Sequence, residues 1–174
     1  LSTRDTNRLI MKKILIIWIS GTGKTTLALK LSSILNIPLF HYDTYCWNNN
    51  WIQQNEEMVK QKILKMLSED HCILEWYIEP GSKERLEWAD RIIYLDYSGL
   101  QAAIWGIQRW WKYRGRKRPE MADGCIEKLD WNHLRVMFWR DERKEIERVI
   151  VWYEYKLVRL RSRKETNSFL STLI

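Results

Sequence analysis

The 174-residue chain has little cysteine, proline or glycine and no long hydrophobic run. Its three cysteines, Cys46, Cys72 and Cys125, are odd in number and form no C-x-x-C pair, which argues against a disulfide framework and against a zinc knuckle. We interpret them as free thiols. The longest apolar run, Ile14–Ile19, has the length of a strand, whereas a membrane-spanning helix needs about 20 apolar residues. The sequence therefore predicts a protein that does not span a membrane.

An export signal is also missing from the start of the chain. Residues 1–10 mix charged and polar side chains and lack the apolar core of a signal peptide, so we expect a cytoplasmic protein. Because this stretch precedes Met11, we interpret it as a leader or as upstream read-through, and we expect it to be disordered. Residues 11–174 have the length of one domain, and a hydrophobic content of 45% in the chain is enough for a core.

Basic residues outnumber acidic ones, which gives a formal net charge of +7 and a pI near 9.3. This balance favours polyanionic ligands, which include nucleotide phosphates, phosphorylated substrates and nucleic acid. Charge by itself does not choose among the three. Six basic residues crowd into one stretch without an intervening acid, namely Arg109, Lys112, Arg114, Arg116, Lys117 and Arg118.

Apolar runs and amphipathic stretches alternate along the chain, which predicts an α/β fold with a parallel sheet and helices on both faces. We expect a basic loop at Tyr113–Gly124, where glycine and proline interrupt the pattern. The expected strands are Met11–Ile19, Ile37–Tyr42, Cys72–Leu74, Arg91–Leu95 and Lys156–Leu160. The expected helices are Lys24–Leu35, Glu56–Leu67, Leu100–Lys112, Trp131–Glu154 and a short one from Lys164.

The chemistry is concentrated in the window Trp18–Thr25, which matches the phosphate-binding pattern G-x-x-x-x-G-K-[ST] everywhere except at its first position. Gly21 and Gly23 allow backbone conformations that aim N–H groups at phosphate oxygens, and the following helix adds its positive end. Lys24 would bridge the β and γ phosphates of ATP, and Thr25 would place its hydroxyl on Mg²⁺. The expected ATP-binding residues of this loop are Ser20, Gly21, Thr22, Gly23, Lys24, Thr25 and Thr26.

From Met11 to about Leu170 the chain resembles the adenylate-kinase-like P-loop proteins known as DNA topology modulation proteins (FlaR type). Besides the phosphate loop, the likeness is carried by His41–Asp43 with Trp47 and Trp51, and by Lys112–Gly115, Arg118–Cys125, Glu127–Trp131 and Leu160–Glu165. The resemblance implies a P-loop NTPase with a nucleoside-monophosphate-kinase-like three-layer sandwich. It also implies a five-stranded parallel sheet and a mobile, basic, helical lid at about 105–125.

The same resemblance assigns further site residues. Asp43 would act as a general base toward an acceptor hydroxyl or hold a magnesium-bound water, although an acidic helix cap is the simpler alternative. For His41 a structural hydrogen bond is the simpler interpretation. Glu75 follows the third strand and would contact Mg²⁺ through water, whereas a plain surface acid is the alternative. Arg161, in the last matching stretch, would contact the nucleotide.

In the lid, Arg114 and Arg118 match the family pattern best and would neutralise the transferring phosphoryl group. A solvated basic face and a nucleic-acid contact are the alternatives that remain open for this stretch. The second alternative draws on the aromatic residues that interleave with the basic ones and could stack bases, namely Trp105, Trp110, Trp111 and Tyr113.

Two departures place tryptophan where the relatives have glycine, at Trp18 and Trp76. An indole next to the phosphate cradle is expected to crowd it, so glycine at both positions would raise the affinity for ATP. Either the chain is a degenerate member with weakened nucleotide binding, or its source reads UGA as glycine and the tryptophans come from translation with the wrong code. A general replacement is excluded, because Trp47, Trp51 and Trp131 match tryptophans of the relatives.

These observations predict an ATP- and Mg²⁺-dependent P-loop phosphotransferase that moves the γ-phosphoryl group to an unidentified acceptor, which is a nucleotide or another small molecule. The alternatives are an ATP-binding, DNA-interacting protein and a nucleotide-binding protein without turnover. Nucleic acid is a secondary candidate partner, and the sequence does not indicate an oligomeric state.

Overall fold

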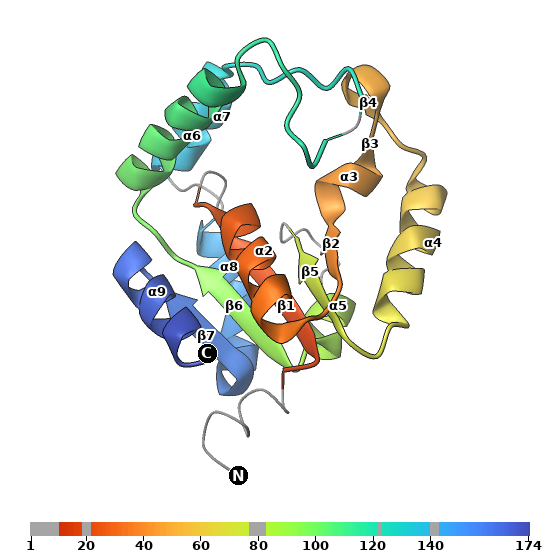
Figure 1. Cartoon of the computed structure of the whole chain (residues 1–174), viewed down its shortest axis with the longest axis vertical. Helices are drawn as coiled ribbons and strands as arrows, with labels where there is room; N and C mark the ends of the chain where they lie inside the picture. Colours follow the sequence, from red (N-terminus) through yellow and green to blue (C-terminus); the bar gives the residue numbers. More distant parts are fainter. Residues whose placement is uncertain (1–10, 19–21, 77–82, 122, 140–142) are drawn as a thin grey trace.

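The computed structural model describes residues 11–18, 22–76, 83–121, 123–139 and 143–174, with the backbone alone at Trp18 (Figure 1). The expected leader, residues 1–10, lies outside the described residues, as do Ser20 and Gly21 of the phosphate loop.

Five parallel strands form the central sheet, in the spatial order β2-β5-β1-β6-β7. β1 lies in the middle and pairs with β5 on one side and with β6 on the other. Parallel neighbours need crossover connections, and helices supply them here. The predicted α/β fold with a five-stranded parallel sheet is confirmed. The strands are β1 (Lys13–Trp18), β2 (Leu39–His41), β5 (Cys72–Glu75), β6 (Arg91–Leu95) and β7 (Leu157–Leu160).

Helices cover both faces of this sheet, which gives the expected three layers (Figure 1). Two turns of 3₁₀ helix, Asn49–Trp51 and Val151–Lys156, complete the helical segments that the structure describes. The helices are α2 (Lys24–Leu35), α3 (Tyr42–Cys46), α4 (Glu56–Leu67), α5 (Lys83–Trp88), α6 (Gly99–Tyr113), α7 (Trp131–Trp139), α8 (Arg143–Ile150) and α9 (Arg163–Ser171).

Four of the described helices begin at a side-chain cap, and at α7 this is Asp130, whose carboxylate accepts two backbone N–H bonds. The Asn55 side chain accepts two backbone N–H bonds at the start of α4, and Ser98 accepts one at the start of α6. Ser162 caps α9 by accepting the backbone N–H of Glu165, whose carboxylate in turn accepts from the Ser162 hydroxyl and from the backbone N–H of Arg161. Such caps satisfy N–H groups that have no partner within the helix, and they explain why the helices start at these residues.

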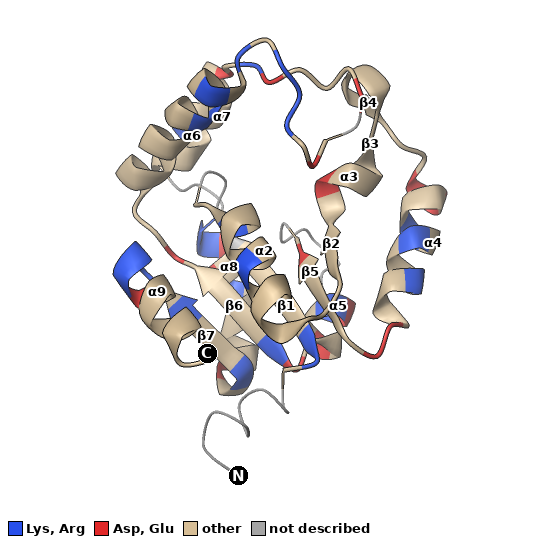
Figure 2. Cartoon of the chain, viewed as in Figure 1, with Lys and Arg blue, Asp and Glu red and all other residues tan. Residues whose placement is uncertain are grey.

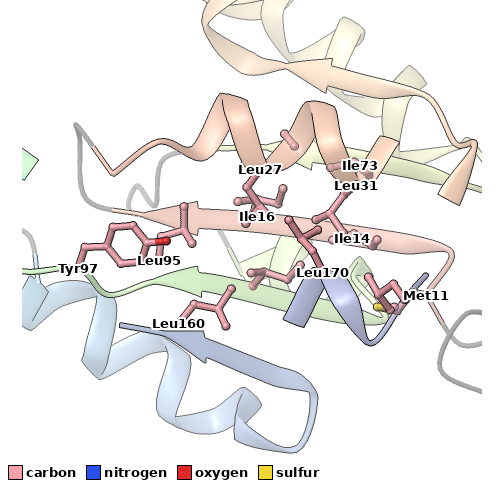
Figure 3. Close-up of a cluster of buried hydrophobic side chains, with 13 residues drawn as sticks. Met11, Ile14, Ile16, Leu27, Leu31, Ile73, Leu95, Tyr97, Leu160 and Leu170 are labelled. Carbon is pink, nitrogen blue, oxygen red and sulfur yellow. The ribbon is translucent and has the colours of Figure 1, made fainter. Parts of the chain in front are cut away.

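The first core cluster lies between the sheet and helices α2 and α9 (Figure 3). Because successive side chains of a strand point to opposite faces, Ile14 and Ile16 of β1 both reach this side. They meet Leu27 and Leu31, which lie one turn apart on α2, and Leu170 of α9. This packing fixes α2 along the middle strand, so its N-terminus lies at the carboxyl edge of the sheet.

The second core cluster lies on the opposite face and contains Trp76, whose side chain is 1% exposed. Its ring lies 3.6 Å from the ring of Tyr42 and 3.7 Å from the Arg85 guanidinium, measured between centres. Glu75, the preceding residue, points to the other face, toward α2. The expectation that the indole of Trp76 crowds the phosphate cradle is therefore wrong, because strand alternation turns it into the core. The side chain of Trp18 lies outside the described residues.

The single helix expected at Trp131–Glu154 is also wrong. The structure has α7 and α8 instead, and Glu154 lies in the 3₁₀ turn that precedes β7. Leu134 and Met137 of α7 pack against α6, whereas Ile146 and Ile150 of α8 pack beneath the sheet. The amphipathic pattern continues through both helices, but the apolar face of α7 packs against α6 and that of α8 packs against the sheet.

Between β2 and α4 the chain forms a small antiparallel hairpin of β3 (Trp47–Asn48) and β4 (Ile52–Gln53), which we call the hairpin. The segment from Arg114 to Glu127, which follows α6 and which we call the lid segment, reaches across to this hairpin (Figure 1). The sequence predicted the basic part of this segment as a loop but did not predict the hairpin. No helix among the described residues is long and apolar enough to cross a membrane.

Replacing Trp76 with glycine is expected to lower the free energy of unfolding by about 3–5 kcal/mol, because it leaves a large cavity in the second core cluster. Urea denaturation measures the change, with Trp152→Gly as the control, since Trp152 is 79% exposed. Equal stability of the parent and Trp76→Gly would contradict the buried position of this indole.

Candidate active site

Lys24 opens α2 directly after Gly23, whose backbone is left-handed at φ 80° and ψ 24°. Glycine takes this conformation at little cost, which accounts for its place at the end of the loop. Within the described residues no side chain caps this end of α2, and its first turn contains no acidic residue, so α2 itself does not neutralise the positive end of its dipole. Thr22 is buried, and its Oγ1 has no hydrogen-bond partner in the part of the chain that the structure describes. An anion suits this position.

Two carboxylates face Lys24 from the neighbouring strands. Its Nζ lies 3.3 Å from Oε1 of Glu75 and 3.6 Å from Oδ2 of Asp43. Glu75 ends β5, and Asp43 lies in the first turn of α3, which follows β2 directly. Because parallel strands end at the same edge of a sheet, β1, β2 and β5 bring these three side chains together. The sequence assigned all three to the site, and the structure places them in one cluster.

Glu75 is held by two further partners. The Thr25 hydroxyl donates to its Oε1 at 2.9 Å, and Nδ1 of His41 lies 2.7 Å from its Oε2. His41 is the strand neighbour of Glu75 in the β2–β5 register. The contact with Glu75 is a hydrogen bond of the kind that the simpler interpretation of His41 expects.

Glu75 keeps its negative charge although its side chain is only 5% exposed. Burial alone raises the pKa of this carboxyl, but the His41 hydrogen bond, the Lys24 charge and the Thr25 hydroxyl together hold the pKa below its ordinary value of 4.5. An ionised carboxylate beside a hydroxyl offers the oxygen ligands that Mg²⁺ prefers. No group of three or more potential metal ligands occurs within the described residues, so a magnesium ion here would rely mainly on water and phosphate oxygens. The residues present fit ATP and Mg²⁺.

Comparisons with known proteins identify the fold. No model of a known protein family matches the sequence, and no curated protein sequence matches it. Shikimate kinase from Bacteroides thetaiotaomicron matches with a TM-score of 0.58 and 15% identity, over 94% of this chain and 96% of that chain. Shikimate kinase from Acinetobacter baumannii, solved with shikimate, matches with a TM-score of 0.58 and 14% identity, over 98% and 94%. A gluconokinase from Sinorhizobium meliloti 1021 matches with a TM-score of 0.53 and 14% identity, over 94% of both chains.

The fold is that of the P-loop kinases. At these identities the likeness concerns the fold alone, and the resemblance to DNA topology modulation proteins stays a prediction.

In this P-loop kinase fold the lid segment is organised around Glu127, which is 6% exposed. Arg109 of α6 donates from Nε to its Oε1 at 2.9 Å. Nε of Arg118 lies 2.9 Å from Oε2 of Glu127, which makes an ion pair, although its N–H is not directed at that oxygen. The NH1 group of Arg118 donates a hydrogen bond to Glu120. Arg118 is thus buried within the lid segment, whereas Arg114 is exposed and stacks on Trp110 at 5.5 Å. Their roles on a phosphoryl group stay predictions.

Acidic residues neutralise part of the positive charge of the basic stretch. Lys117 pairs with Asp123, and Arg109 and Arg118 pair with Glu127. Among the described residues, three of the six clustered basic residues therefore have a carboxylate partner, which the sequence did not reveal because these acids follow the stretch rather than interrupt it. This pairing weakens the case for a basic surface that binds nucleic acid. Figure 2 shows where basic and acidic residues lie along the ribbon of the lid segment.

Arg161 follows β7, and its Nε lies 3.9 Å from Oδ2 of Asp96. The side chain is 67% exposed, and the backbone N–H is held by the Glu165 carboxylate. Asp96, just after β6, is nearly buried and also receives hydrogen bonds from Arg143 and Arg159. This cluster lies at the carboxyl edge of the sheet. Sequence reasoning missed Asp96, whose only signal was its place after an apolar strand.

Replacing Glu75 with glutamine is expected to flatten the acid limb of the stability curve. Since the folded-state pKa of Glu75 is lowered, its contribution to the free energy of unfolding is fully present above 4.5 and is lost as the pH falls through the folded-state value. Urea denaturation between about pH 3 and pH 7 measures the slope. Glu69→Gln, at an exposed position, controls for the loss of one charge. Parallel curves for the parent and Glu75→Gln would contradict the assignment.

Proposed function

We propose that this protein is an ATP- and Mg²⁺-dependent phosphotransferase that moves the γ-phosphoryl group of ATP to a hydroxyl of a nucleotide or another small molecule. The observation that carries the proposal is the position of Lys24, which lies at the N-terminus of α2 and within 3.6 Å of carboxylates from two neighbouring strand ends. A lysine, a helix N-terminus and a carboxylate at this edge of a P-loop kinase fold form a combined site for phosphate and cation.

Lys24 binds the β and γ phosphates in this proposal. Its side chain is 16% exposed, and its ammonium group already lies beside two carboxylates. Phosphate oxygens can therefore replace part of this negative environment without burying a new charge. The α2 N-terminus adds a favourable potential along the same direction. Ser20, Gly21, Thr22 and Gly23 complete the proposed cradle, Thr26 contacts the α phosphate or caps the helix, and Arg161 contacts the nucleotide from the end of β7.

Thr25 and Glu75 hold the magnesium side of the proposed site. When bound, Mg²⁺ would neutralise phosphate charge and orient the phosphates. The Thr25 hydroxyl would supply a direct oxygen ligand, and the ionised Glu75 would accept hydrogen bonds from water around the ion. His41 keeps the Glu75 carboxylate in a fixed orientation, since it bonds the oxygen that Thr25 does not use.

Asp43 is proposed to accept the proton of the acceptor hydroxyl at its carboxylate, or to hold a magnesium-bound water. Its side chain is 35% exposed, which leaves it accessible to a small acceptor. It also lies beside Lys24, so proton acceptance and phosphate binding occur at neighbouring positions. Arg114 and Arg118 of the lid segment are proposed to neutralise charge on the transferring group.

Lys24→Ala is expected to abolish ADP release in a phosphotransfer screen with ATP, Mg²⁺ and a panel of nucleoside monophosphates and small alcohols. Removing Lys24 takes away the cation assigned to the β and γ phosphates, and circular dichroism should show an intact fold. Lys30→Ala, at an exposed position of the same helix, is the control and should keep the parent rate.

Equal ADP release by the parent and Lys24→Ala would refute the assignment. A parent that binds ATP but releases no ADP with any acceptor would make the protein a nucleotide-binding protein without turnover.

Arg114→Ala is expected to lower kcat more than it weakens ATP binding, because the lid arginines are assigned to charge that develops during transfer. Arg116→Ala, two residues further on and equally exposed, is the control. Steady-state kinetics and an ATP titration separate the two effects. Loss of ATP affinity with an unchanged kcat would assign Arg114 to ground-state binding instead.

A further inference from the structure

The lid segment, which lies between α6 and α7 in the sequence, is attached to the hairpin by a set of hydrogen bonds. The backbone N–H of Asn50 donates to the carbonyl of Asp123 at 3.2 Å. The Cys125 thiol, which is 1% exposed, donates to the carbonyl of Asn48 at 3.3 Å. The second contact joins residues 77 positions apart in the sequence.

Trp51 makes two hydrogen bonds to the lid segment. Its backbone N–H donates to Sγ of Cys125 at 3.3 Å, and its indole Nε1 donates to the carbonyl of Ile126 at 3.0 Å. Trp47 supports the indole through an edge contact, with ring centres 5.7 Å apart. Trp51 therefore binds two successive residues of the lid segment at once.

The turn that presents Trp51 is strained. Asn50 has φ 60° and Trp51 has φ 63°, and a left-handed backbone is rare for a bulky residue such as tryptophan. Strained turns persist where surrounding contacts determine them. Here the contacts come from the lid segment, because Gly124 approaches Asn50 so closely that a Cβ at Gly124 would overlap Oδ1 of Asn50.

Both ends of this attachment lead toward the proposed active site. On the hairpin side, Thr44 follows Asp43 directly, and its hydroxyl donates to the carbonyl of Glu120 in the lid segment at 2.7 Å. On the lid side, Ile126 precedes Glu127, which pairs with Arg109 and Arg118 and lies in backbone register with Arg114. A continuous set of contacts thus connects Asp43 with the lid arginines.

We propose that Trp51 is a positioning residue that joins the hairpin and the lid segment into one moving unit. When an acceptor binds beside Asp43 and displaces the hairpin, the lid segment moves with it and carries Arg114 toward the phosphates. The effect of this coupling on catalysis rests on the proposed function. The mechanical coupling itself is a property of the free protein.

The chain offers a matched pair of variants that tests the coupling. Gly115 and Gly124 both have φ 71°, so alanine strains the backbone equally at either position, but only alanine at 124 meets Asn50. Hydrogen exchange of the free protein should therefore show faster exchange of the hairpin, residues 47–53, in Gly124→Ala and not in Gly115→Ala.

In Trp51→Phe, which removes the indole donor, exchange at 123–127 should rise about three- to tenfold, as expected for one lost hydrogen bond. Equal exchange of the hairpin in the two alanine variants would overturn the coupling.

Kinetics then test the positioning role. Trp51→Phe and Gly124→Ala should raise KM for the acceptor and lower kcat while leaving the Kd for ATP unchanged, whereas Gly115→Ala should keep the parent acceptor KM. Unchanged acceptor KM and kcat in Trp51→Phe would overturn the positioning role. A parent without phosphotransfer would overturn the proposed function, and the exchange experiment would still decide the coupling by itself.

Discussion

The site depends on one ionic contact, in which Lys24 lies between the carboxylates of Glu75 and Asp43. A lysine with a side chain exposed by only 16% needs opposite charge nearby, and a nearly buried Glu75 needs the same in return. Removing either partner would leave the other charge poorly compensated. The contact therefore stabilises the free protein and also places a cation and an anion where phosphate and magnesium can use them.

This contact exists because of how the sheet is built. The middle strand β1 leads to α2, while its neighbour β5 ends at Glu75 and the edge strand β2 leads to Asp43. The first core cluster holds α2 against β1, and the second holds the residue after Glu75 on the opposite face. Strand alternation thus sends Glu75 to the site and Trp76 to the core, so the same few residues serve chemistry and stability.

The sequence predicted the parts of the fold in which a periodic pattern serves a single core. The bounds of α2 and α4 agree with prediction, since each helix has one apolar face. The bounds of β6 agree as well, because it is a short, continuous apolar run whose side chains enter both core clusters. Prediction from the sequence failed where one amphipathic pattern packs against two cores, as in the helix expected at Trp131–Glu154. It also failed for Trp76, because strand alternation decides to which face of the sheet that side chain points. It could not predict the pairing of Glu127 with Arg109 and Arg118, because partners brought together by the fold leave no spacing signal.

The central claim is that the cluster around Lys24 binds the phosphates of ATP, and calorimetric titration of the parent with ATP and Mg²⁺, and separately with adenosine, tests it most directly. The contacts to ATP that are assigned to Lys24, Thr25 and Glu75 go to phosphate and magnesium, and no contact of this cluster is assigned to the adenosine part. The account therefore predicts saturable binding of ATP and no measurable binding of adenosine at the same concentrations. Adenosine that binds as tightly as ATP would contradict it.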